Sequence, residues 1–414
     1  MVHKGESVNI SLRKINKKNI LKIVLEKGSI SRTGISKYLK ISRPTTSSYI
    51  YELIKEGLVE EKGKSKSTPA GGRKAILLNF NRKAGYILGV MIGVETIRIA
   101  LSDLVSNIIR LIKIPTEEWE GPEVVIENIV KNLKELIKES GISKENFIGV
   151  GIGATGLVDS KTGDVIFSPN LKGWNNIRLK EIMEKKMDLP TFIENECRIQ
   201  AIAEKKFGLA KNIKNFVCVE TGIGIGTGVF INNRLLVGNK GIAGEVGHII
   251  ANITGYRLCH CGNMGCIETL CSTRSLLEDI KNDFKKIGNK SSDIKRLEIK
   301  DIYNLYKQGS EIVVQNVEKN AEYLGIAVSN IIKMFNPEII IIHGEAIKFG
   351  EKYLDLVKKS VAKKTFPKVK DVYNIQFSRL GEEIGIMGAT SFVFTNIINL
   401  ENLNIAEYYI IKKT

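Results

Sequence analysis

Four residues of the kind that ligate metal ions lie within a short stretch of the sequence. The segment GHIIANITGYRLCHCGNMGC contains the candidate ligands His248, Cys259, Cys261 and Cys266, with glycines at 262 and 265 that let the chain turn. Three thiolates and one imidazole complete a tetrahedral zinc site and leave no open coordination position. The spacing therefore predicts a structural zinc ion, Zn2+, and not a hydrolytic one.

The chain has three further cysteines, and one further histidine lies close to the candidate ligands. His260 is an alternative ligand, although its place between two ligating cysteines points it away from the metal. Cys271 is expected to be a buried thiol, and Cys197 and Cys218 lie in apolar-rich segments. Spacing of this kind is typical of a metal site and not of a disulfide framework.

The positive charge of the chain is concentrated near its N-terminus. Residues 1–82 contain 18 Lys and Arg residues against six Glu, a net charge of +12 out of +17 for all 414 residues. Such a segment binds a polyanion, or forms a solvated face or a disordered arm, and charge alone does not separate these interpretations. The sequence has no apolar run of the roughly 20 residues that span a bilayer and no signal peptide, so we expect a cytoplasmic protein without membrane contact.

The pattern of this basic segment predicts three short helices and two strands. NKKNILKIVLE at 16–26 places apolar side chains on one helical face. A second helix is expected to begin at a Ser31 cap, and a third at a Ser42 cap with Gly57 as its stop. The tight turn between them is typical of a helix-turn-helix, whose third helix enters the major groove of DNA. LVEE and AILLNF then predict two strands, joined by the basic wing KGKSKSTPAGGRK.

Candidate DNA contacts follow from this arrangement. Small polar and basic side chains at the start of the third helix point outward, where larger ones would hold it away from the base edges. Basic wing residues would contact phosphates, and Arg73, flanked by glycines, is an alternative minor-groove contact. The predicted DNA-contacting residues are Arg32, Arg43, Thr45, Ser48, Tyr49, Lys62, Lys64 and Arg73.

Beyond Phe80, apolar strands alternate with amphipathic helices, which predicts an α/β fold. Strand-like runs include YILGVMIGV, TIRIAL, FIGVGIGA, FVCVETGIGIGTGVFI and EIIIIHG, and helices are expected at 124–140 and 313–335. The glycine run TGIGIGTG at 221–228 suits either a close approach to a ligand or a tight hairpin.

Several motifs in one order resemble the ROK family of repressors and sugar kinases, in particular its repressors with an N-terminal winged helix. They are GGR at 71–73, SPNLKGW at 168–174, ENE at 194–196, GIAGEVGH at 241–248 and CHCGNMGCIE at 259–268. The resemblance implies a winged helix-turn-helix followed by a two-lobed α/β body of the actin, hexokinase and ribonuclease H-like type, with a structural zinc. The implied domains are residues 1–82, a first lobe at 83–195 completed by a C-terminal helix at about 384–400, and a second lobe at 196–383.

The resemblance also implies a monosaccharide site between the lobes. Carried over to the matching motifs, the family's sugar-binding residues are Asn170, Asn195, Glu196, Glu245, His248 and Glu268. Carboxylates and amides suit pairs of sugar hydroxyls, and they reject analogues that leave them unpaired. His248 belongs to both sets, because one ring nitrogen can bind zinc while the other meets a hydroxyl.

The sequence departs from the kinases of the resembled family in the turn that binds the nucleotide in those kinases. These kinases carry Asp-x-Gly-Gly-Thr-Lys where this chain has a stretch that includes Met91, Val94, Glu95 and Thr96. A bulky and an anionic side chain in this turn disfavour bound phosphates. Glu196 replaces the family's catalytic Asp and is one methylene longer, which disturbs general-base geometry. We therefore expect no enzymatic activity.

The resemblance implies a repressor of carbohydrate-utilisation genes. D-xylose is the expected effector, with glucose or another aldose as the alternative. The sugar is expected to release a homodimer or tetramer from palindromic, double-stranded operator DNA. Two other functions stay open: a sugar kinase that retains a DNA-binding head, and a regulator controlled by a sugar-transporter protein. Sugar-enhanced DNA binding is also compatible with the sequence.

Overall fold

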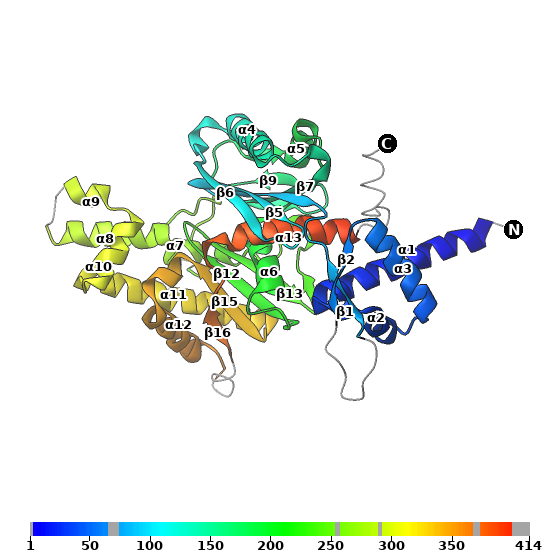
Figure 1. Cartoon of the computed structure of the whole chain (residues 1–414). Helices are drawn as coiled ribbons and strands as arrows, with labels where there is room; N and C mark the ends of the chain where they lie inside the picture. The colour runs from blue at the N-terminus through cyan, green and yellow to red at the C-terminus, as the bar shows by residue number, and fades with distance from the viewer. Residues whose placement is uncertain (1–2, 65–73, 253–256, 289–291, 367–372, 400–414) are drawn as a thin grey trace.

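The chain forms a small N-terminal head followed by two α/β lobes (Figure 1). The structure is a computed structural model that describes residues 3–64, 74–252, 257–288, 292–366 and 373–399. Among the helices in these ranges, none is both long and apolar enough to cross a membrane.

The head contains three helices, two of which begin at the predicted caps. Its helices are α1 (His3–Lys27), α2 (Arg32–Leu39) and α3 (Arg43–Lys55). The Ser31 hydroxyl accepts a hydrogen bond from the Gly34 amide, and the Ser42 hydroxyl accepts one from the Thr45 amide. The first helix is longer than the predicted 16–26, because the polar residues before Asn16 continue the helix beyond the amphipathic part.

The strands of the head complete a winged helix-turn-helix, as predicted. They are β1 (Ile30–Ser31), β2 (Val59–Lys64) and β3 (Ile76–Phe80), and they form an antiparallel sheet in the order β1-β3-β2. The β2–β3 hairpin is the predicted wing. Its residues 65–73, which include Arg73, lie outside the described residues.

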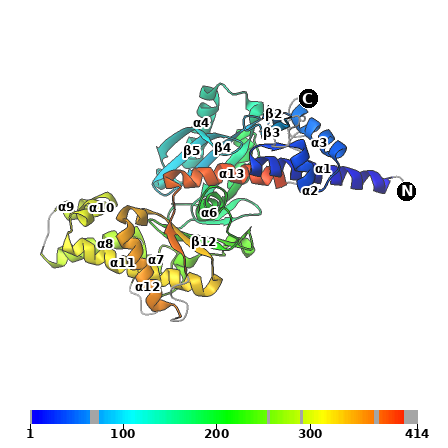
Figure 2. The same ribbon diagram turned by 60° about the horizontal axis from the view of Figure 1, so that its bottom comes forward.

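One hydrophobic core joins the head to the last described helix, α13 (Ile384–Asn399). Ile20, Ile50 and Leu78 of the head are fully buried in the same cluster as Val393 and Phe394 of α13. The rings of Phe80 and Phe394 pack edge to face, with centroids 5.6 Å apart. Two views of the molecule show α13 running from between the lobes to the head (Figures 1 and 2).

The first lobe is built on a five-stranded sheet in the order β11-β7-β4-β5-β6. Its strands are β4 (Tyr86–Ile92), β5 (Thr96–Asp103), β6 (Ile108–Pro115), β7 (Phe147–Ala154) and β11 (Thr191–Asn195). Strands β4, β5 and β6 form an antiparallel meander, and β7 and β11 extend it in parallel with β4. A smaller antiparallel sheet contains β8 (Leu157–Asp159), β9 (Asp164–Phe167) and β10 (Asn175–Ile177).

Helices cover both faces of the first sheet. One face packs on α4 (Pro122–Ser140) and α5 (Leu179–Met187), and the other on α13 and α6 (Glu196–Phe207) (Figure 1). The alternating glycines of FIGVGIGA explain how α13 approaches so closely. A Cβ atom at Gly151 would lie 2.1 Å from the Ala389 carbonyl oxygen, so only glycine fits there.

The second lobe has its own five-stranded sheet, in the order β14-β13-β12-β15-β16. Its strands are β12 (Phe216–Thr221), β13 (Ile225–Ile231), β14 (Arg234–Leu235), β15 (Ile339–Gly344) and β16 (Ile375–Phe377). The run FVCVETGIGIGTGVFI, which resembles one long strand in the sequence, is therefore a hairpin of β12 and β13. Gly222 and Gly224 supply the turn between these strands.

The helices of the second lobe form its main core. They are α7 (Glu268–Cys271), α8 (Thr273–Lys286), α9 (Ser292–Arg296), α10 (Ile299–Lys307), α11 (Glu311–Phe335) and α12 (Glu351–Lys364). Buried side chains of α8, α10, α11 and α12 pack against β12 and β15, while the opposite face of the sheet meets α6. Helix α6 thus lies between the two sheets (Figure 2). The domain boundaries at 82/83, 195/196 and 383/384 stay predictions.

Candidate ligand cleft and metal centre

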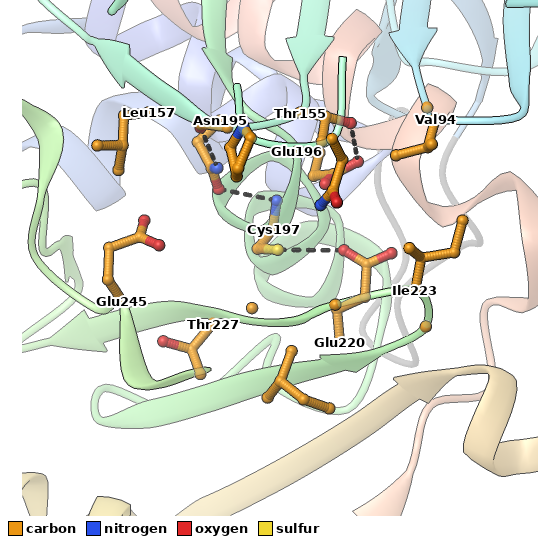
Figure 3. A pocket seen from close by; sticks show the side chains of 18 of the residues that line it. Val94, Thr155, Leu157, Asn195, Glu196, Cys197, Glu220, Ile223, Thr227 and Glu245 are labelled. Carbon is orange, nitrogen blue, oxygen red and sulfur yellow. Dashed lines mark hydrogen bonds between the residues drawn. The ribbon is translucent and has the colours of Figure 1, made fainter. Parts of the chain in front are cut away.

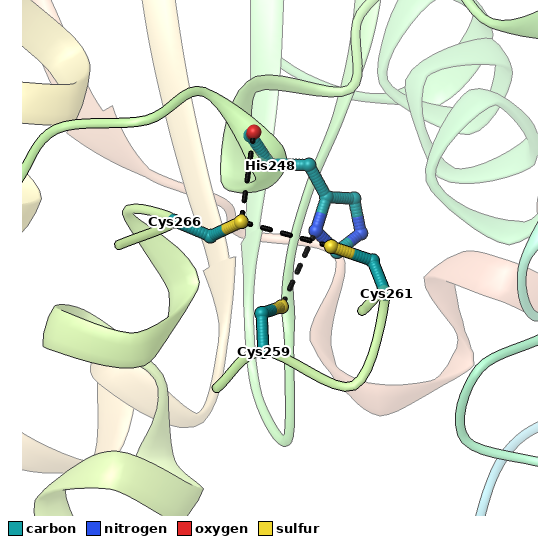
Figure 4. Close-up of side chains that lie close together, drawn as sticks. All are labelled: His248, Cys259, Cys261 and Cys266. Carbon is teal, nitrogen blue, oxygen red and sulfur yellow. Dashed lines mark hydrogen bonds between the residues drawn. The ribbon is translucent and has the colours of Figure 1, made fainter. Parts of the chain in front are cut away.

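The four predicted metal ligands meet at one point (Figure 4). Their ligand atoms all lie within 4.8 Å of one another. The His248 Nδ1 atom is 3.6 Å from Cys259 Sγ, and the sulfur atoms of Cys261 and Cys266 are 3.7 Å apart. In a tetrahedral site with Zn–S bonds of about 2.3 Å, neighbouring sulfur ligands lie about 3.8 Å apart. The donor set and its spacing therefore fit a zinc ion.

Local backbone geometry positions this metal group. Gly265 has a positive φ of 77°, and a Cβ atom there would lie 2.0 Å from the Asn252 carbonyl oxygen. Burial, followed by the neighbouring Cys261 thiol, raises the pKa of Cys266 to about 11, so the thiolate form needs a cation beside it. His260 is exposed and lies outside the group, and Cys271 is buried, both as the sequence suggested.

A cavity of about 450 Å³ opens between the two lobes beside the metal group (Figure 3). It is within the size range of small-molecule pockets. The structure brings together at this cavity all six residues predicted to bind sugar: Asn170, Asn195, Glu196, Glu245, His248 and Glu268.

The start of α6 places two of these residues. The Asn195 carbonyl oxygen, Oδ1, accepts hydrogen bonds from the amides of Cys197 and Arg198, at 3.0 and 3.3 Å. Its Nδ2 donates to the Gly156 carbonyl at 2.8 Å. Asn195 is thus the cap of α6, and its amide is already used within the chain. The neighbouring Glu196 carboxylate accepts a hydrogen bond of 2.9 Å from the Thr155 hydroxyl.

A buried ion pair anchors the loop that carries Glu245 and His248. Arg198 and Glu194 are almost fully buried and pair at 2.7 Å, and the Arg198 guanidinium also donates to the Gly241 carbonyl. Glu194 accepts a further hydrogen bond from Ser160. The loop is therefore held against α6, which fixes its carboxylate at the cleft. Burial raises the pKa of this Glu245 carboxyl.

Asn170 and Arg274 connect the two lobes across the cleft. Asn170 lies in the 168–174 loop of the first lobe, and Arg274 is the second residue of α8 in the second lobe. The Arg274 guanidinium donates a hydrogen bond of 3.0 Å to Asn170 Oδ1. A change in the opening of the lobes would change this contact.

The cavity wall also contains polar residues that the sequence did not indicate, among them Arg98, Cys197, Gln200 and Glu220. The Cys197 thiol donates to a Glu220 carboxylate oxygen at 3.1 Å (Figure 3). Cys197 was expected among apolar side chains, but its position in the first turn of α6 directs it to the cleft. The sequence could have indicated that Glu220 lies at the cleft, because it is a charged residue near the end of an apolar strand, directly before the glycine run.

Seven of the predicted DNA-contacting residues lie in the described part of the head, and four of these are exposed. Arg43 and Ser48 are exposed on α3, as is Lys64 at the end of β2. Lys62 is also exposed and lies 3.9 Å from Glu60, while Thr45 is half-buried beside the Ser42 hydroxyl. Arg32 pairs with Glu61 of the wing at 2.5 Å. Tyr49, predicted to point outward, is half-buried against the core of the head because its ring covers apolar side chains there.

Two sequence profiles match the chain. The profile of the ROK family matches residues 87–396, and that of the winged helix-turn-helix DNA-binding domain matches residues 13–60. The chain belongs to the ROK family. It is 34% identical over 394 residues to the xylose repressor of Caldicellulosiruptor bescii, across 94% of this chain and 97% of that protein.

Two further relatives of this ROK protein are similar over nearly all of its length. The xylose repressor of Bacillus subtilis is 33% identical over 389 residues, which cover 94% of this chain and 97% of that protein. A solved structure of a ROK family transcriptional regulator, described as a homologue of the Escherichia coli MLC protein, has a TM-score of 0.81 at 25% identity. It covers 97% of this chain and 100% of its own. The winged helix and the two-lobed ROK body are thereby established.

The turn between β4 and β5, where the sequence predicts a departure from ROK kinases, lies at the cavity. Met91 and Val94 line the cavity, and Met91 packs against Gly385 at the start of α13. The Gly93 amide donates to the Thr96 carbonyl at 3.2 Å, and the Glu95 carbonyl accepts from the Thr116 amide at 3.1 Å. The turn is therefore closed by hydrogen bonds of its own and of the adjoining strand.

Proposed function

We propose that this ROK protein is a sugar-responsive, DNA-binding transcriptional repressor of carbohydrate-utilisation genes, without kinase activity. The observation that carries the proposal is that one helix belongs to both the cleft and the head. Ile384 and Gly385 at the start of α13 line the cavity, and Phe394 lies in the core of the winged helix. A sugar that changes the opening of the lobes therefore acts on an element that supports the head.

D-xylose is the proposed effector, and glucose or another aldose is the second choice. Support comes from the names of two relatives that are 33–34% identical over nearly the whole chain, both xylose repressors. The proposed sugar ligands are the six predicted residues at the cavity. We further propose that zinc occupies the cysteine group in a structural role, since His248 would then be held in the orientation that presents its ring to the cleft.

The proposed mechanism is release of DNA on sugar binding. A homodimer or tetramer holds two heads at the spacing of a palindromic operator. A ligand shifts this equilibrium only through its different affinity for the two states, so the sugar must bind the DNA-free conformation more tightly.

Operator binding measured with a panel of sugars tests this proposal. Fluorescence anisotropy of the full-length protein on its own upstream DNA is recorded with xylose, glucose or N-acetylglucosamine. We expect xylose to weaken operator affinity by about 10-fold or more, within the usual range of coupling between two sites. The same protein with sugar and ATP should release no ADP above background. Sugar-dependent ADP release, or operator affinity that no sugar changes, would contradict the proposal.

Arg43 offers a test of the DNA-binding face. It is the first residue of α3 and is exposed. We expect Arg43→Ala to weaken operator binding by about 10-fold and binding to random DNA by less, because base contacts carry the selectivity. Lys55→Ala, at the other end of the same helix, is the matched control and should keep the operator preference. An equal loss on operator and random DNA would make Arg43 a phosphate contact instead.

A further inference from the structure

The glycine run at 221–228 is a motif that the proposed function does not use. Glycine-rich turns that follow a strand commonly bind phosphate, because their amide groups are free to point at an anion. Here two of the amides at the hairpin have partners in the chain. The Gly222 amide donates to the Gly224 carbonyl at 3.0 Å, and the Ile225 amide donates to Glu268 Oε2 at 3.0 Å.

The carboxylate of Glu268 rests directly on this hairpin. A Cβ atom at Gly224 would lie 2.5 Å from Glu268 Oε2, so a side chain at this position would displace the carboxylate from where it now lies. Glu268 itself is only 7% exposed. The hairpin therefore already holds an anionic group, and that group belongs to the protein.

The rest of the cavity wall is also acidic. Carboxyl groups of five residues line it: Glu196, Glu220, Glu245, Glu268 and Glu382. Of the described lining residues, Arg98 alone carries a fixed positive charge, and its guanidinium lies 3.9 Å from Glu382. Burial and then the charge of the neighbouring Glu220 raise the pKa of Glu196, so Glu220 is the charged member of this pair.

We propose that Glu220, together with Glu268 on the glycine hairpin, excludes phosphate groups from the cleft, so that the effector is an unphosphorylated sugar. This inference rests on the proposed sugar-binding function and adds the chemical class of the ligand. Glu220 is the second-last residue of β12 and lines the cavity beside the hairpin, where a phosphate on a bound sugar or nucleotide would meet a like charge. Glu220 is then a specificity-determining residue that acts by repulsion.

Calorimetric titration of the full-length protein with a free sugar and with its phosphate ester tests this inference. D-xylose and xylose 5-phosphate, then glucose and glucose 6-phosphate, are titrated with and without Mg2+. We expect the ester to bind the wild-type protein at least about 30-fold more weakly than the free sugar, and this ratio to shrink as salt rises from about 50 mM to about 500 mM. Glu220→Gln should reduce the ratio by about 10-fold, since it removes the charge and keeps the shape.

Two variants serve as controls for the charge of Glu220. Glu220→Asp keeps the carboxylate and should keep most of the discrimination, so a general disturbance of the cleft is distinguished from a loss of charge. Glu135→Gln removes a carboxylate from an exposed position on α4 and should leave the wild-type ratio unchanged.

The outcomes separate this inference from the proposed function. If the wild-type protein binds a phosphate ester as tightly as the free sugar, with or without Mg2+, phosphate exclusion is wrong while sugar sensing stands. A ratio that is the same in wild-type and Glu220→Gln protein would also overturn the inference. If no free sugar binds and none alters operator affinity, the proposed function itself fails, and the inference falls with it.

Discussion

Two groups of side chains beside the cleft each bring metal-ligand atoms within 4.8 Å of one another, yet they differ in chemistry. In the group of His248 and three cysteines, two contacts join ligand atoms to each other at 3.6 and 3.7 Å, and the sulfur atoms also lie 3.6 to 3.7 Å from the Glu268 carboxylate, the Asn263 amide and the His248 carbonyl. In the group of Glu196, Cys197 and Glu220, each carboxyl group accepts a hydrogen bond, Glu196 from the Thr155 hydroxyl and Glu220 from the Cys197 thiol. Proximity of the ligand atoms therefore does not by itself distinguish a metal site. The type of the donor atoms, and whether their spacing leaves room for an ion, distinguish the two groups.

Loss of the cysteine group should have the largest effect. We expect Cys266→Ala to reduce bound zinc from about one ion per chain to near zero, because three ligands cannot close the site. Effector affinity should fall about 10-fold or more, since His248 and Glu268 both adjoin the metal loop. Elemental analysis and calorimetry measure the two effects, and Cys271→Ala, which removes a buried thiol outside the group, should retain zinc. Full zinc content in Cys266→Ala would contradict the proposed ligand set.

The group of Glu196, Cys197 and Glu220 should make the stability of the protein depend on pH and not on a metal ion. Between the ordinary Glu pKa of 4.5 and the raised pKa of Glu196, the folded chain holds a proton that the unfolded chain has released. Stability therefore falls as the pH rises through this window. We expect Glu196→Gln to remove that loss and to melt about 2 °C higher than wild type at about pH 8, with no gain below pH 4.5.

A cation held by this second group would reverse the result. Glu196→Gln would then lower the melting temperature at neutral pH, and added divalent metal would stabilise the wild-type protein but not the variant. Glu135→Gln, on the exposed face of α4, is the control and should melt as the wild type does at every pH.

Cys197→Ser should give the smallest effect. Its hydroxyl can still donate to Glu220 in place of the thiol, so we expect zinc content and melting temperature to stay close to wild type. Elemental analysis after dialysis against Zn2+ or Mn2+ provides the measurement. Loss of a bound metal ion from this variant would show that the two groups are more alike than their contacts indicate.

Local signals in the sequence predicted much of this molecule. Ser31 and Ser42 were recognisable as caps because capping depends on residues three positions apart. The metal group and the six cleft residues were found through short motifs. Glu220 was not predicted and Tyr49 was predicted to point outward, since the side of an element that a residue faces depends on what packs against it. The contact between α13 and the head joins residues more than 300 positions apart, and no local pattern records it.

Because the head shares a hydrophobic core with α13, the head is not a structurally independent domain. Phe80 would lose its edge-to-face partner Phe394 if the chain were cut after residue 82. A head excised at that point, or grafted onto another sensor, would expose the ring of Phe80 that Phe394 now covers. The apolar core of the winged helix is thus continued by a segment that follows it in the chain by some 300 residues.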